Sequence, residues 1–201
     1  MSKRPIDIHG FEAKFRDNSD PWNYEASAFE AYKRGVLRRA CGSRLYGRGL
    51  ELACANGETT KMLANFCLKL LAVDGSKTAA QTARDRTRHL SNVEVLQALL
   101  PQDMPRGPFD LIVISELLYY LKRHDLDETL RLCADALAPG GRIVCLHHVI
   151  PFDDVSVPPR MAQDRANTYL GRRFRKLIDA PHGRFKVSAF QRPRLRVASA
   201  T

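Results

Sequence analysis

The fold of this chain is decided by residues 51–57, Glu51-Leu52-Ala53-Cys54-Ala55-Asn56-Gly57. They form the end of a short apolar strand that begins near residue 48, a turn of small residues, and the approach to a helix that starts near Thr59. Small residues at such a turn let a ligand approach the backbone, and the first helical turn offers N–H groups without intrahelical partners. The stretch therefore predicts a strand–turn–helix unit with a ligand at its turn.

Helices and strands are predicted to alternate on both sides of this unit. Apolar residues at helical spacing, with Gly42 as a stop, predict a helix over residues 25–41. Further helices are expected at 59–66, 76–90 and 125–137, and further strands at 68–73, 93–96, 109–114 and 142–147. The run 109–114 is unbroken, as in a strand buried on both faces. We therefore predict an α/β fold with a doubly wound, mostly parallel sheet and helices on both faces.

The two ends of the chain are expected to differ from this pattern. Residues 1–20 are polar and mixed in charge, and we interpret them as an arm or irregular lead-in. Residues 160–178 fit an amphipathic helix, and the alternation over 185–189 indicates a half-exposed strand. Leu195 and Val197 could add another strand.

The composition is that of a soluble globular domain. The chain has 201 residues, of which 44% are apolar and 27% charged, and this excludes disorder, a collagen-like sequence and a disulfide scaffold. The five cysteines include no CxxC pair, so we expect buried, reduced thiols rather than a zinc or redox site. There is neither an apolar secretory leader nor a run of roughly 20 apolar residues, which favours a cytoplasmic protein without a membrane span.

The net charge of +10 suggests anionic partners, including nucleic acid. Residues 151–201 carry 11 basic and 4 acidic side chains, whereas residues 1–150 carry 21 and 18. Most of the excess therefore lies in the last quarter. We divide the chain into an arm and helix covering the ligand site (1–45), a ligand-binding core (46–150), and a basic helix with closing strands of the same domain (151–201).

Polar residues stand where the predicted strands end, and ligands of open parallel sheets bind outside the carboxyl ends of the strands. Asp74 ends the strand after the turn, seventeen residues beyond Gly57. A carboxylate at that place can accept hydrogen bonds from both hydroxyls of a ribose. The strand at 109–114 leads into Ser115 and Glu116.

Taken in order, these segments resemble the class I S-adenosylmethionine-dependent methyltransferases and, within them, the nodulation protein S group. The resemblance covers about residues 10–150. Its specificity comes from several matching segments in the same order and at the same separations, because the turn alone is a weak signal. The matching segments are Asp20-Pro21-Trp22, Phe29-Glu30, and residues 51–57, 72–74, 109–113 and 116–121. It implies a Rossmann-like sheet of seven strands, S-adenosylmethionine as the cofactor and no metal.

The resemblance also implies where the cofactor would lie. Glu51 would orient the first loop, and Asp74, followed by Gly75, would hold the ribose. The other expected contacts are the backbone of Ala53, Cys54, Ala55 and Gly57 beside the methionine moiety, Leu99 and Leu100 at the adenine, Ser115 and Glu116 facing the sulfonium, and Trp22, Tyr24 and Tyr32 from the N-terminal helix and its approach.

Two positions depart from the pattern that the resemblance implies. Ala53 stands where the group has glycine, and its Cβ would disfavour a positive φ by about 1 kcal/mol. Leu99 stands where an acidic residue often accepts a hydrogen bond from the adenine amino group, and the loss of that bond would cost roughly 0.5–1.5 kcal/mol. We expect cofactor binding to persist but to be weaker than usual.

The candidate catalytic residues follow the fourth and fifth strands. Methyl transfer needs alignment, and it needs a base only where the nucleophile arrives protonated. Neighbours on a strand point to opposite faces, so one of His147 and His148 is expected at the pocket, and we favour His147. We assign catalytic roles to His147, Glu116 and Tyr120. Packing remains the alternative for Tyr120 and its neighbour Tyr119, and orientation of the cofactor or a helix cap for Glu116.

The nodulation protein S group N-methylates an amino sugar on a chitin-like oligosaccharide, so the resemblance implies a small amine or an amino-sugar or oligosaccharide acceptor. The basic tail could bind an acidic group on it. Nucleic acid is disfavoured because Ser115-Glu116-Leu117-Leu118 stands where base-directed amino-methyltransferases carry Pro-Pro-aromatic, and no cysteine follows a proline. Two alternatives stay open: an RNA- or nucleic-acid-directed methyltransferase, and a catalytically weak S-adenosylmethionine-binding protein.

Overall fold

A computed structural model describes residues 5–194 of the chain. Its helices are α1 (Ile8–Asp17), α2 (Ala28–Cys41), α3 (Glu58–Ala64), α4 (Lys77–Thr87), α5 (Arg123–Ala136) and α6 (Pro159–Gly171), with a 3-10 turn η1 (Leu118–Tyr120). Its strands are β1 (Tyr46–Leu52), β2 (Cys67–Asp74), β3 (Val93–Gln97), β4 (Phe109–Ser115), β5 (Leu137–His148), β6 (Arg175–His182) and β7 (Phe185–Gln191).

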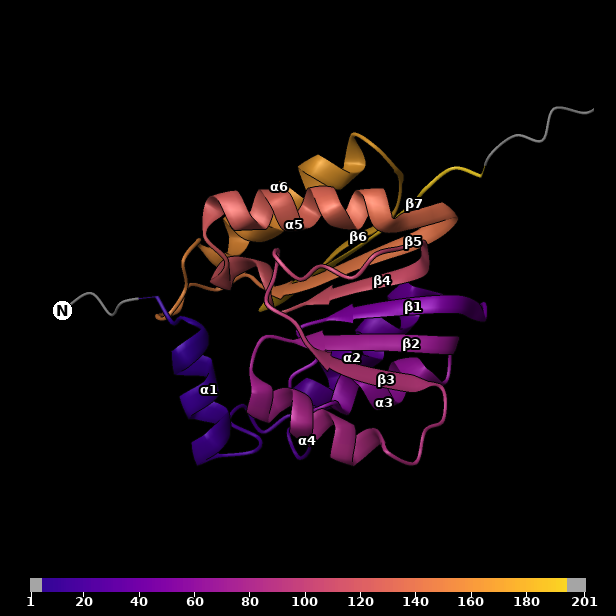
Figure 1. The fold of residues 1–201 in the computed structure, drawn as a ribbon. Coiled ribbons are helices and arrows are strands. Elements are labelled where there is room, and N and C mark those ends of the chain that lie inside the picture. Colours follow the sequence, from indigo (N-terminus) through magenta and orange to yellow (C-terminus); the bar gives the residue numbers. More distant parts are fainter. Residues whose placement is uncertain (1–4, 195–201) are drawn as a thin grey trace, which may run out of the picture.

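The seven strands form one sheet in the order β3-β2-β1-β4-β5-β7-β6. β1 to β5 run parallel, and β7 pairs antiparallel with both β5 and β6. The strand order reverses between β1 and β4, so the carboxyl ends of these two strands form the switch point at which ligands bind in such sheets. In Figure 1 these ends point toward α1. The predicted doubly wound, mostly parallel sheet of seven strands is confirmed.

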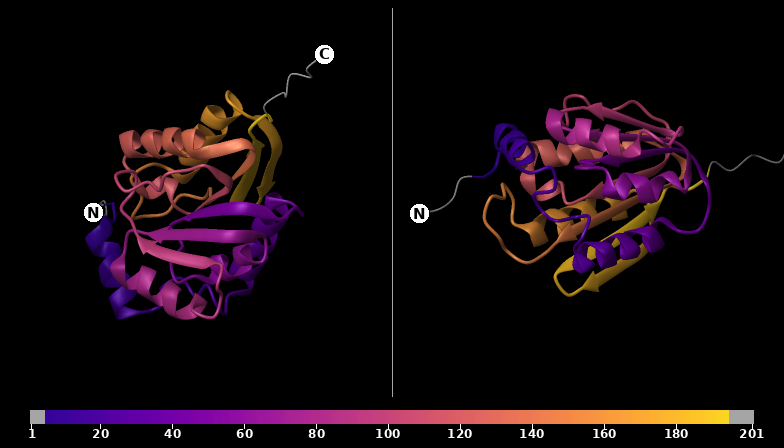
Figure 2. Two further views of the ribbon diagram at one scale, coloured as in Figure 1. Left: turned by 45° about the vertical axis from the view of Figure 1, so that its right-hand side comes forward. Right: turned by 90° about the horizontal axis from the view of Figure 1, so that it is seen from below.

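Helices cover both faces of the sheet (Figures 1 and 2). α5 and α6 pack on one face through Leu126, Leu130 and Leu170, and α2 and α3 pack on the other through Leu37 and Leu63. α4 covers β2 and β3 on the α2 and α3 side. β4 is buried on both faces, as its unbroken apolar run predicts, because its alternate side chains enter the two separate cores.

Residues 8–17 form a helix, so the prediction of an irregular arm over residues 1–20 is wrong in this part. The side chain of Asp7 caps α1 by accepting the N–H of Gly10. The carboxylate of Glu12 accepts the hydroxyls of Ser76 and Thr78 and the N–H of Thr78, at the start of α4. These hydrogen bonds lower the pKa of Glu12 to about 2. α1 is therefore held to the sheet domain by these polar contacts as well as by the rings of Phe11 and Phe15, which pack against Tyr120 and Trp22.

The predicted helix over 160–178 is too long. α6 ends at Gly171, and residues 175–182 form the edge strand β6 instead. Pairing with β7 satisfies the backbone groups on one side of this edge strand, and this long-range pairing overrides the local helical spacing. β7 confirms a strand at 185–189, but the expectation that it is half-exposed is wrong: β7 lies between β5 and β6, and its Ser188 is buried together with Val187 and Ala189. The strand suggested at Leu195 and Val197 lies outside the described residues.

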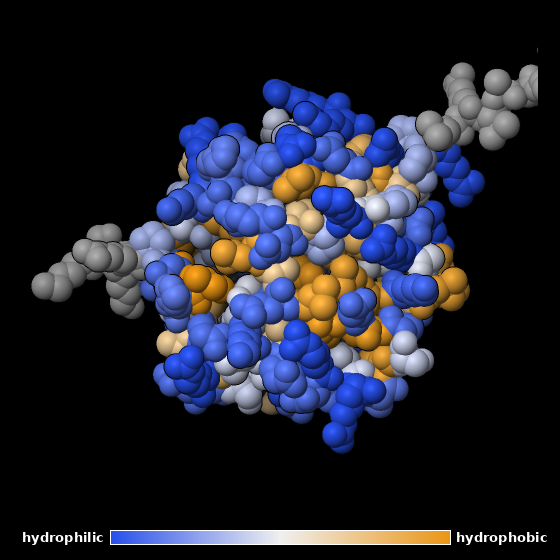
Figure 3. Space-filling view, in the orientation of Figure 1, coloured by the Kyte–Doolittle hydropathy of each residue, from blue (hydrophilic) through white to orange (hydrophobic). Residues whose placement is uncertain are grey.

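The surface in the view of Figure 3 is mostly hydrophilic, with apolar atoms gathered at the centre, between α5 and α4. β3 and β4 are joined there by residues 98–108, a connection without a helix. All five cysteines are buried and unpaired, as expected. Within residues 5–194, no helix has the length and apolarity needed to cross a membrane.

Gly57, the last residue of the turn that decides the fold, cannot be replaced without strain. Its φ is +85°, and a Cβ there would stand 3.1 Å from the Cα of Ala83 in α4. We expect Gly57→Ala to lower the free energy of unfolding by about 2–3 kcal/mol, since left-handed strain and a backbone contact add. Gly183 is the control: its φ is +66° with nothing within 4 Å of a Cβ, so Gly183→Ala should cost about 1 kcal/mol. If Gly57→Ala and Gly183→Ala lowered the free energy of unfolding equally in urea, the contact with Ala83 would be unimportant.

Candidate active site

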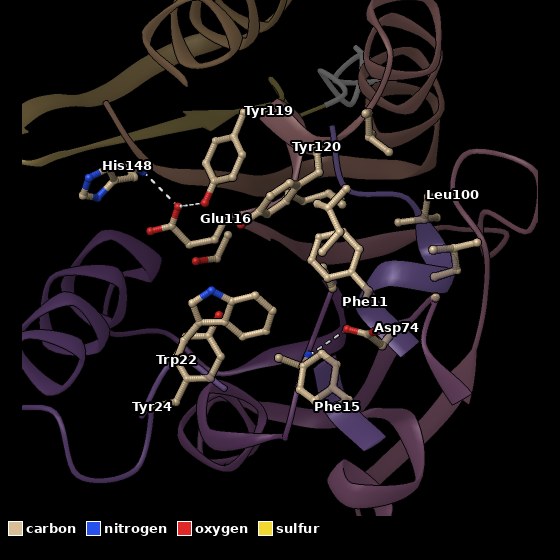
Figure 4. Close-up of a pocket in the computed structure, with 18 of the residues that line it drawn as sticks. Phe11, Phe15, Trp22, Tyr24, Asp74, Leu100, Glu116, Tyr119, Tyr120 and His148 are labelled. Carbon is tan, nitrogen blue, oxygen red and sulfur yellow. Dashed lines mark hydrogen bonds between the residues drawn. The ribbon is translucent and has the colours of Figure 1, made fainter. Parts of the chain in front are cut away.

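A cavity of about 430 Å³ lies at the carboxyl ends of β1, β2 and β4, at the switch point of the sheet. It runs from Leu100 and Asp74 at one end to Glu116 and His148 at the other (Figure 4). A smaller cavity of about 40 Å³ shares several of its lining residues and extends behind the first loop. The predicted residues that line the main cavity are Trp22, Ala53, Ala55, Asp74, Gly75, Leu99, Leu100, Ser115, Glu116 and Tyr120.

Asp74 is held in place by two backbone groups. Its Oδ2 accepts the N–H of Ala55 and its Oδ1 the N–H of Ser76, both at 2.9 Å. Burial raises the pKa of Asp74 to about 6, although the two N–H donors partly offset this effect. The carboxyl group lines the cavity, and each oxygen keeps a lone pair that can accept a ligand hydroxyl.

The first loop adopts left-handed backbone at both of its lining alanines. Ala53 has a φ of +55° and Ala55 a φ of +50°. The positive φ considered for Ala53 from the sequence is thus present, and Ala55 also has a positive φ. Cys54, between them, lines only the small cavity. A left-handed residue with a Cβ stores strain of about 1–2 kcal/mol.

Replacing Ala53 by glycine should release part of this strain. We expect Ala53→Gly to raise the free energy of unfolding by about 1 kcal/mol and to tighten binding of S-adenosylhomocysteine, because the Cβ no longer narrows the cavity. Thermal unfolding and calorimetry measure the two effects. The control is Ala80→Gly in the middle of α4, which should destabilise by about 1 kcal/mol or more. Weaker ligand binding by Ala53→Gly would contradict this account of the loop.

Glu51 lies behind the loop and reaches only the small cavity. Its Oε2 accepts the hydroxyl of Thr60 in α3 at 2.6 Å. Burial raises the pKa of Glu51 to about 8, so the side chain is largely protonated at neutral pH. The small cavity is also lined by Asn56, whose buried side-chain N and O have no partner among the described residues. This unpaired amide marks a place where a ligand or water can bind.

Glu116 is the centre of a polar network at the other end of the main cavity. Its Oε1 lies 2.6 Å from the ammonium of Lys33, which is also 2.9 Å from Glu30. Its Oε2 accepts the hydroxyl of Tyr119 and the backbone N–H of His148 (Figure 4). Burial raises the pKa of Glu116, but Lys33 and the hydrogen bonds outweigh it and the net pKa is lowered. Two carboxylates and one ammonium give this wall of the cavity a net negative charge.

Aromatic side chains close the cavity on the side of α1. Phe11, Phe15 and Trp22 line it, and the ring of Phe11 packs edge-on against Tyr120 at 4.8 Å between centroids. Tyr24 lines both cavities. Trp22 and Tyr24 were predicted from the sequence, whereas Phe11 and Phe15 were missed. Their spacing with Ile8, three and seven residues on, is helical and would have identified them.

Two predicted contact residues lie away from the main cavity. Tyr32 is 50% exposed, and its hydroxyl pairs with Nδ1 of His182 at 3.0 Å. Tyr32 sits on the face of α2 toward the β6–β7 turn and lines neither cavity. Gly57 lines neither cavity; it shapes the loop by its positive φ.

The two histidines are placed opposite to the expectation that His147 faces the pocket. His147 is fully buried beneath α6, with its Nδ1 bonded to Gln163 and its Nε2 accepting the N–H of Leu118. His148 lines the main cavity instead. Successive side chains of β5 still point to opposite faces of the sheet. In the register that β5 has with β7, His147 is the residue that faces Gln163.

The acidic residues of the cavity are not arranged around a metal ion. Among residues 5–194, no three or more His, Cys, Asp or Glu side chains are grouped as they would be at a metal site. The lining carboxylates are instead engaged by Lys33 and by backbone N–H groups.

The sheet order, the antiparallel β7 and the cavity at the switch point define the class I S-adenosylmethionine-dependent methyltransferase fold. The N-methyltransferase NodS from Bradyrhizobium japonicum, solved in complex with S-adenosyl-L-homocysteine, superposes on this chain with a TM-score of 0.80. The two are 23% identical, and the match covers 94% of this chain and 100% of that one.

The chain belongs to the nodulation protein S family, whose model matches residues 6–146. Nodulation protein S of Sinorhizobium fredii is 33% identical over 127 residues, which are 62% of this chain and 59% of that protein. Nodulation protein S of Bradyrhizobium diazoefficiens is 33% identical over 129 residues, 62% and 61% of the two chains. The matched region thus spans about 60% of the length of these relatives, and the family resemblance on which residues 10–150 were interpreted is confirmed.

Proposed function

We propose that this protein is a methyltransferase that transfers the methyl group of S-adenosylmethionine to the nitrogen of a small amine, with an amino sugar or an oligosaccharide carrying one as the leading acceptor. The observation that carries the proposal is the cavity at the switch point, with the Asp74 carboxylate at one end and the polar network of Glu116 at the other. The similarity to NodS, an N-methyltransferase solved with S-adenosylhomocysteine, supports the choice of reaction.

The lining residues fit this cofactor at three places. Asp74 would accept the ribose hydroxyls, and Leu99 and Leu100 would border the adenine. The left-handed loop of Ala53 and Ala55 would lie beside the methionine moiety, where the unpaired amide of Asn56 can bond a polar group. When bound, S-adenosylmethionine supplies a methyl group on a positively charged sulfur, which the net negative wall around Glu116 favours.

One lining residue, Leu99, is expected to weaken binding of the cofactor. Leu99 is 44% exposed at the cavity and offers no acceptor to the adenine amino group. The backbone strain at Ala53 and Ala55 acts in the same direction. We therefore expect an affinity for S-adenosylhomocysteine in the micromolar range or weaker, rather than no affinity.

Calorimetry with S-adenosylhomocysteine tests the cofactor, and mass spectrometry of glucosamine and deacetylated chito-oligosaccharide incubated with S-adenosylmethionine tests the reaction. We expect saturable binding and a gain of one methyl group on the amine. No binding up to millimolar ligand would refute the methyltransferase assignment. Binding without transfer to any amine would favour a protein that only binds the cofactor, and transfer to mixed tRNA with a steep salt dependence would favour a nucleic-acid acceptor.

The division of the chain and its place in the cell are part of the same proposal. Residues 1–45 would cover the cofactor, residues 46–150 would bind it, and the basic residues 151–201 would complete the sheet and face an acidic group of the acceptor. Five buried thiols without a disulfide suit a reducing compartment, which supports action in the cytoplasm.

A further inference from the structure

The end of the cavity around His148 has charged and aromatic side chains beyond those proposed to hold the cofactor. It is formed by Phe29, Glu30 and Lys33 of α2, by Glu116 and Tyr119, and by His148 and Phe152 at the end of β5 and beyond. In Figure 4, His148 lies beside Glu116 and Tyr119, at the end of the cavity opposite Asp74 and Leu100. A ligand whose ribose is held at Asp74 leaves this end to a second molecule.

Aromatic rings and negative charge together define what this end can hold. The rings of Tyr119 and Phe152 pack edge-on with 5.3 Å between centroids, and Phe152 lies 5.8 Å from the ring of His148. Phe152 is 37% exposed, so an apolar ring face is open at the cavity. Among the charged residues that line this end, Glu30 and Glu116 outnumber Lys33, whereas the guanidinium of Arg184 lies over the Phe29 ring and does not line the cavity. The lining itself therefore favours a cation attached to an apolar or ring-shaped body.

His148 is the group at this end that can accept a proton. Within residues 5–194, neither of its ring nitrogens forms a hydrogen bond; only its backbone N–H is used, by Glu116. Burial lowers the pKa of His148, the nearby Glu116 and Glu30 raise it, and Lys33 and Arg184 lower it, with a net lowering. The imidazole is therefore neutral at pH 7. His147 cannot take this role because both of its ring nitrogens are already bonded.

We propose that the acceptor binds between Glu116, Tyr119 and Phe152 as a protonated amine, and that the imidazole of His148 removes its proton before methyl transfer. The amine loses H⁺ to a ring nitrogen of His148 and regains its lone pair. The nitrogen then forms a bond to the methyl carbon as the carbon–sulfur bond breaks, and that electron pair stays on sulfur as a thioether. The product is a methylated ammonium ion, and His148 returns its proton to solvent. This inference rests on the proposed methyltransferase function.

The first test is the pH dependence of methyl transfer in His148→Gln. General base catalysis contributes roughly 10²–10⁴-fold, so at pH 7 we expect a decrease of that size in the single-turnover rate with glucosamine or deacetylated chito-oligosaccharide. The deficit should shrink toward pH 9–10, where the amine arrives neutral and needs no base. The control is His124→Gln, an exposed histidine of α5, which should leave the rate and its pH profile unchanged. An unchanged rate and pH profile in His148→Gln would overturn the proposal.

The second test does not depend on turnover. The His148 ring resonance, assigned by its absence in His148→Gln, is titrated by NMR in the S-adenosylhomocysteine complex with and without glucosamine or benzylamine. We expect an amine bound as a cation to lower the pKa of His148, and His148→Gln to keep its affinity for S-adenosylhomocysteine within two-fold. If no amine shifts this resonance, His148 does not face the acceptor and the proposal is wrong. Absence of S-adenosylhomocysteine binding in the unmodified protein would instead refute the proposed function itself.

Discussion

Asp74→Asn is expected to weaken binding of S-adenosylhomocysteine at least tenfold at pH 7.5. The carboxylate accepts the N–H groups of Ala55 and Ser76 through its two oxygens. An amide in the same place turns one NH₂ toward a backbone N–H, so that one donor loses its partner and the ribose loses one acceptor. Each loss of this kind costs about 1–3 kcal/mol, and 1.4 kcal/mol is tenfold in affinity. Calorimetry measures the difference directly.

The matched control for this variant is Asp110→Asn. Asp110 also accepts a backbone N–H, that of Arg48 at 2.9 Å, but near the start of β4, at the opposite edge of the sheet. The same chemical change there should leave the affinity within two-fold of the unmodified protein. An unaltered affinity in Asp74→Asn would show that the ribose is held elsewhere.

The pH dependence of binding follows from the same carboxyl group. Burial raises the pKa of Asp74 to about 6, and only the ionised form has acceptors free for two hydroxyls. Protonation therefore competes with the ligand: the affinity should be constant above about pH 7 and fall as the pH decreases through 6. Asp74→Asn, which has no proton to gain, should show no such fall. An affinity of the unmodified protein that is flat from pH 8 to pH 5 would contradict this interpretation.

Glu116→Gln is expected to lower the free energy of unfolding by about 3 kcal/mol at pH 7. The change keeps the shape of the side chain but leaves the buried ammonium of Lys33 with one carboxylate, Glu30, and breaking a buried ion pair on one side costs about 3–5 kcal/mol. Urea unfolding measures the loss. Adding Lys33→Met should recover part of it, because no uncompensated ammonium remains.

The difference in free energy of unfolding between the unmodified protein and Glu116→Gln should decrease as the pH is lowered. The folded-state pKa of Glu116 lies below its ordinary value of 4.5, so its contribution is complete above that pH and is lost as the pH falls. The difference in free energy of unfolding between Glu116→Gln and the unmodified protein should therefore become smaller below about pH 4.5. Glu128→Gln, which removes a half-exposed partner of the exposed Arg131, is the control and should change the free energy of unfolding much less than Glu116→Gln does. A gap that widens in acid would contradict the ion-pair account.

The fold was predictable from the sequence because its signals are local. β1, β2 and β4 contain short apolar runs; Asp74 and Ser115 end β2 and β4, and Gly57 closes the turn that follows β1. The start of α4 is also a local signal, since serine is a favoured N-cap residue and Ser76 accepts the N–H of Ala79. The cavity followed from these elements, because parallel strands bring their carboxyl ends to one edge of the sheet.

The remaining features depend on contacts between distant parts of the chain. Alternation along β5 shows that His147 and His148 face opposite ways, but the register with β7 decides which of them reaches the cavity. Lys33 resembles a solvent-facing helical lysine until β4 brings Glu116 to within 2.6 Å of it. β6 was mistaken for the end of a helix because its partner strand comes later in the chain.

The attachment of α1 and the occupancy of the cavity must influence each other reciprocally. α1 contributes Phe11 and Phe15 to the cavity wall, while Glu12 on the same helix binds the start of α4 and Lys14 lies 3.8 Å from Asp154. Whatever free energy a ligand gains from a docked α1, the docking of α1 gains equally from the ligand. We therefore expect a bound ligand to stabilise the docked position of α1, and the fluorescence of Trp22, the single tryptophan of the chain and a neighbour of Phe15, to report any change in that docking.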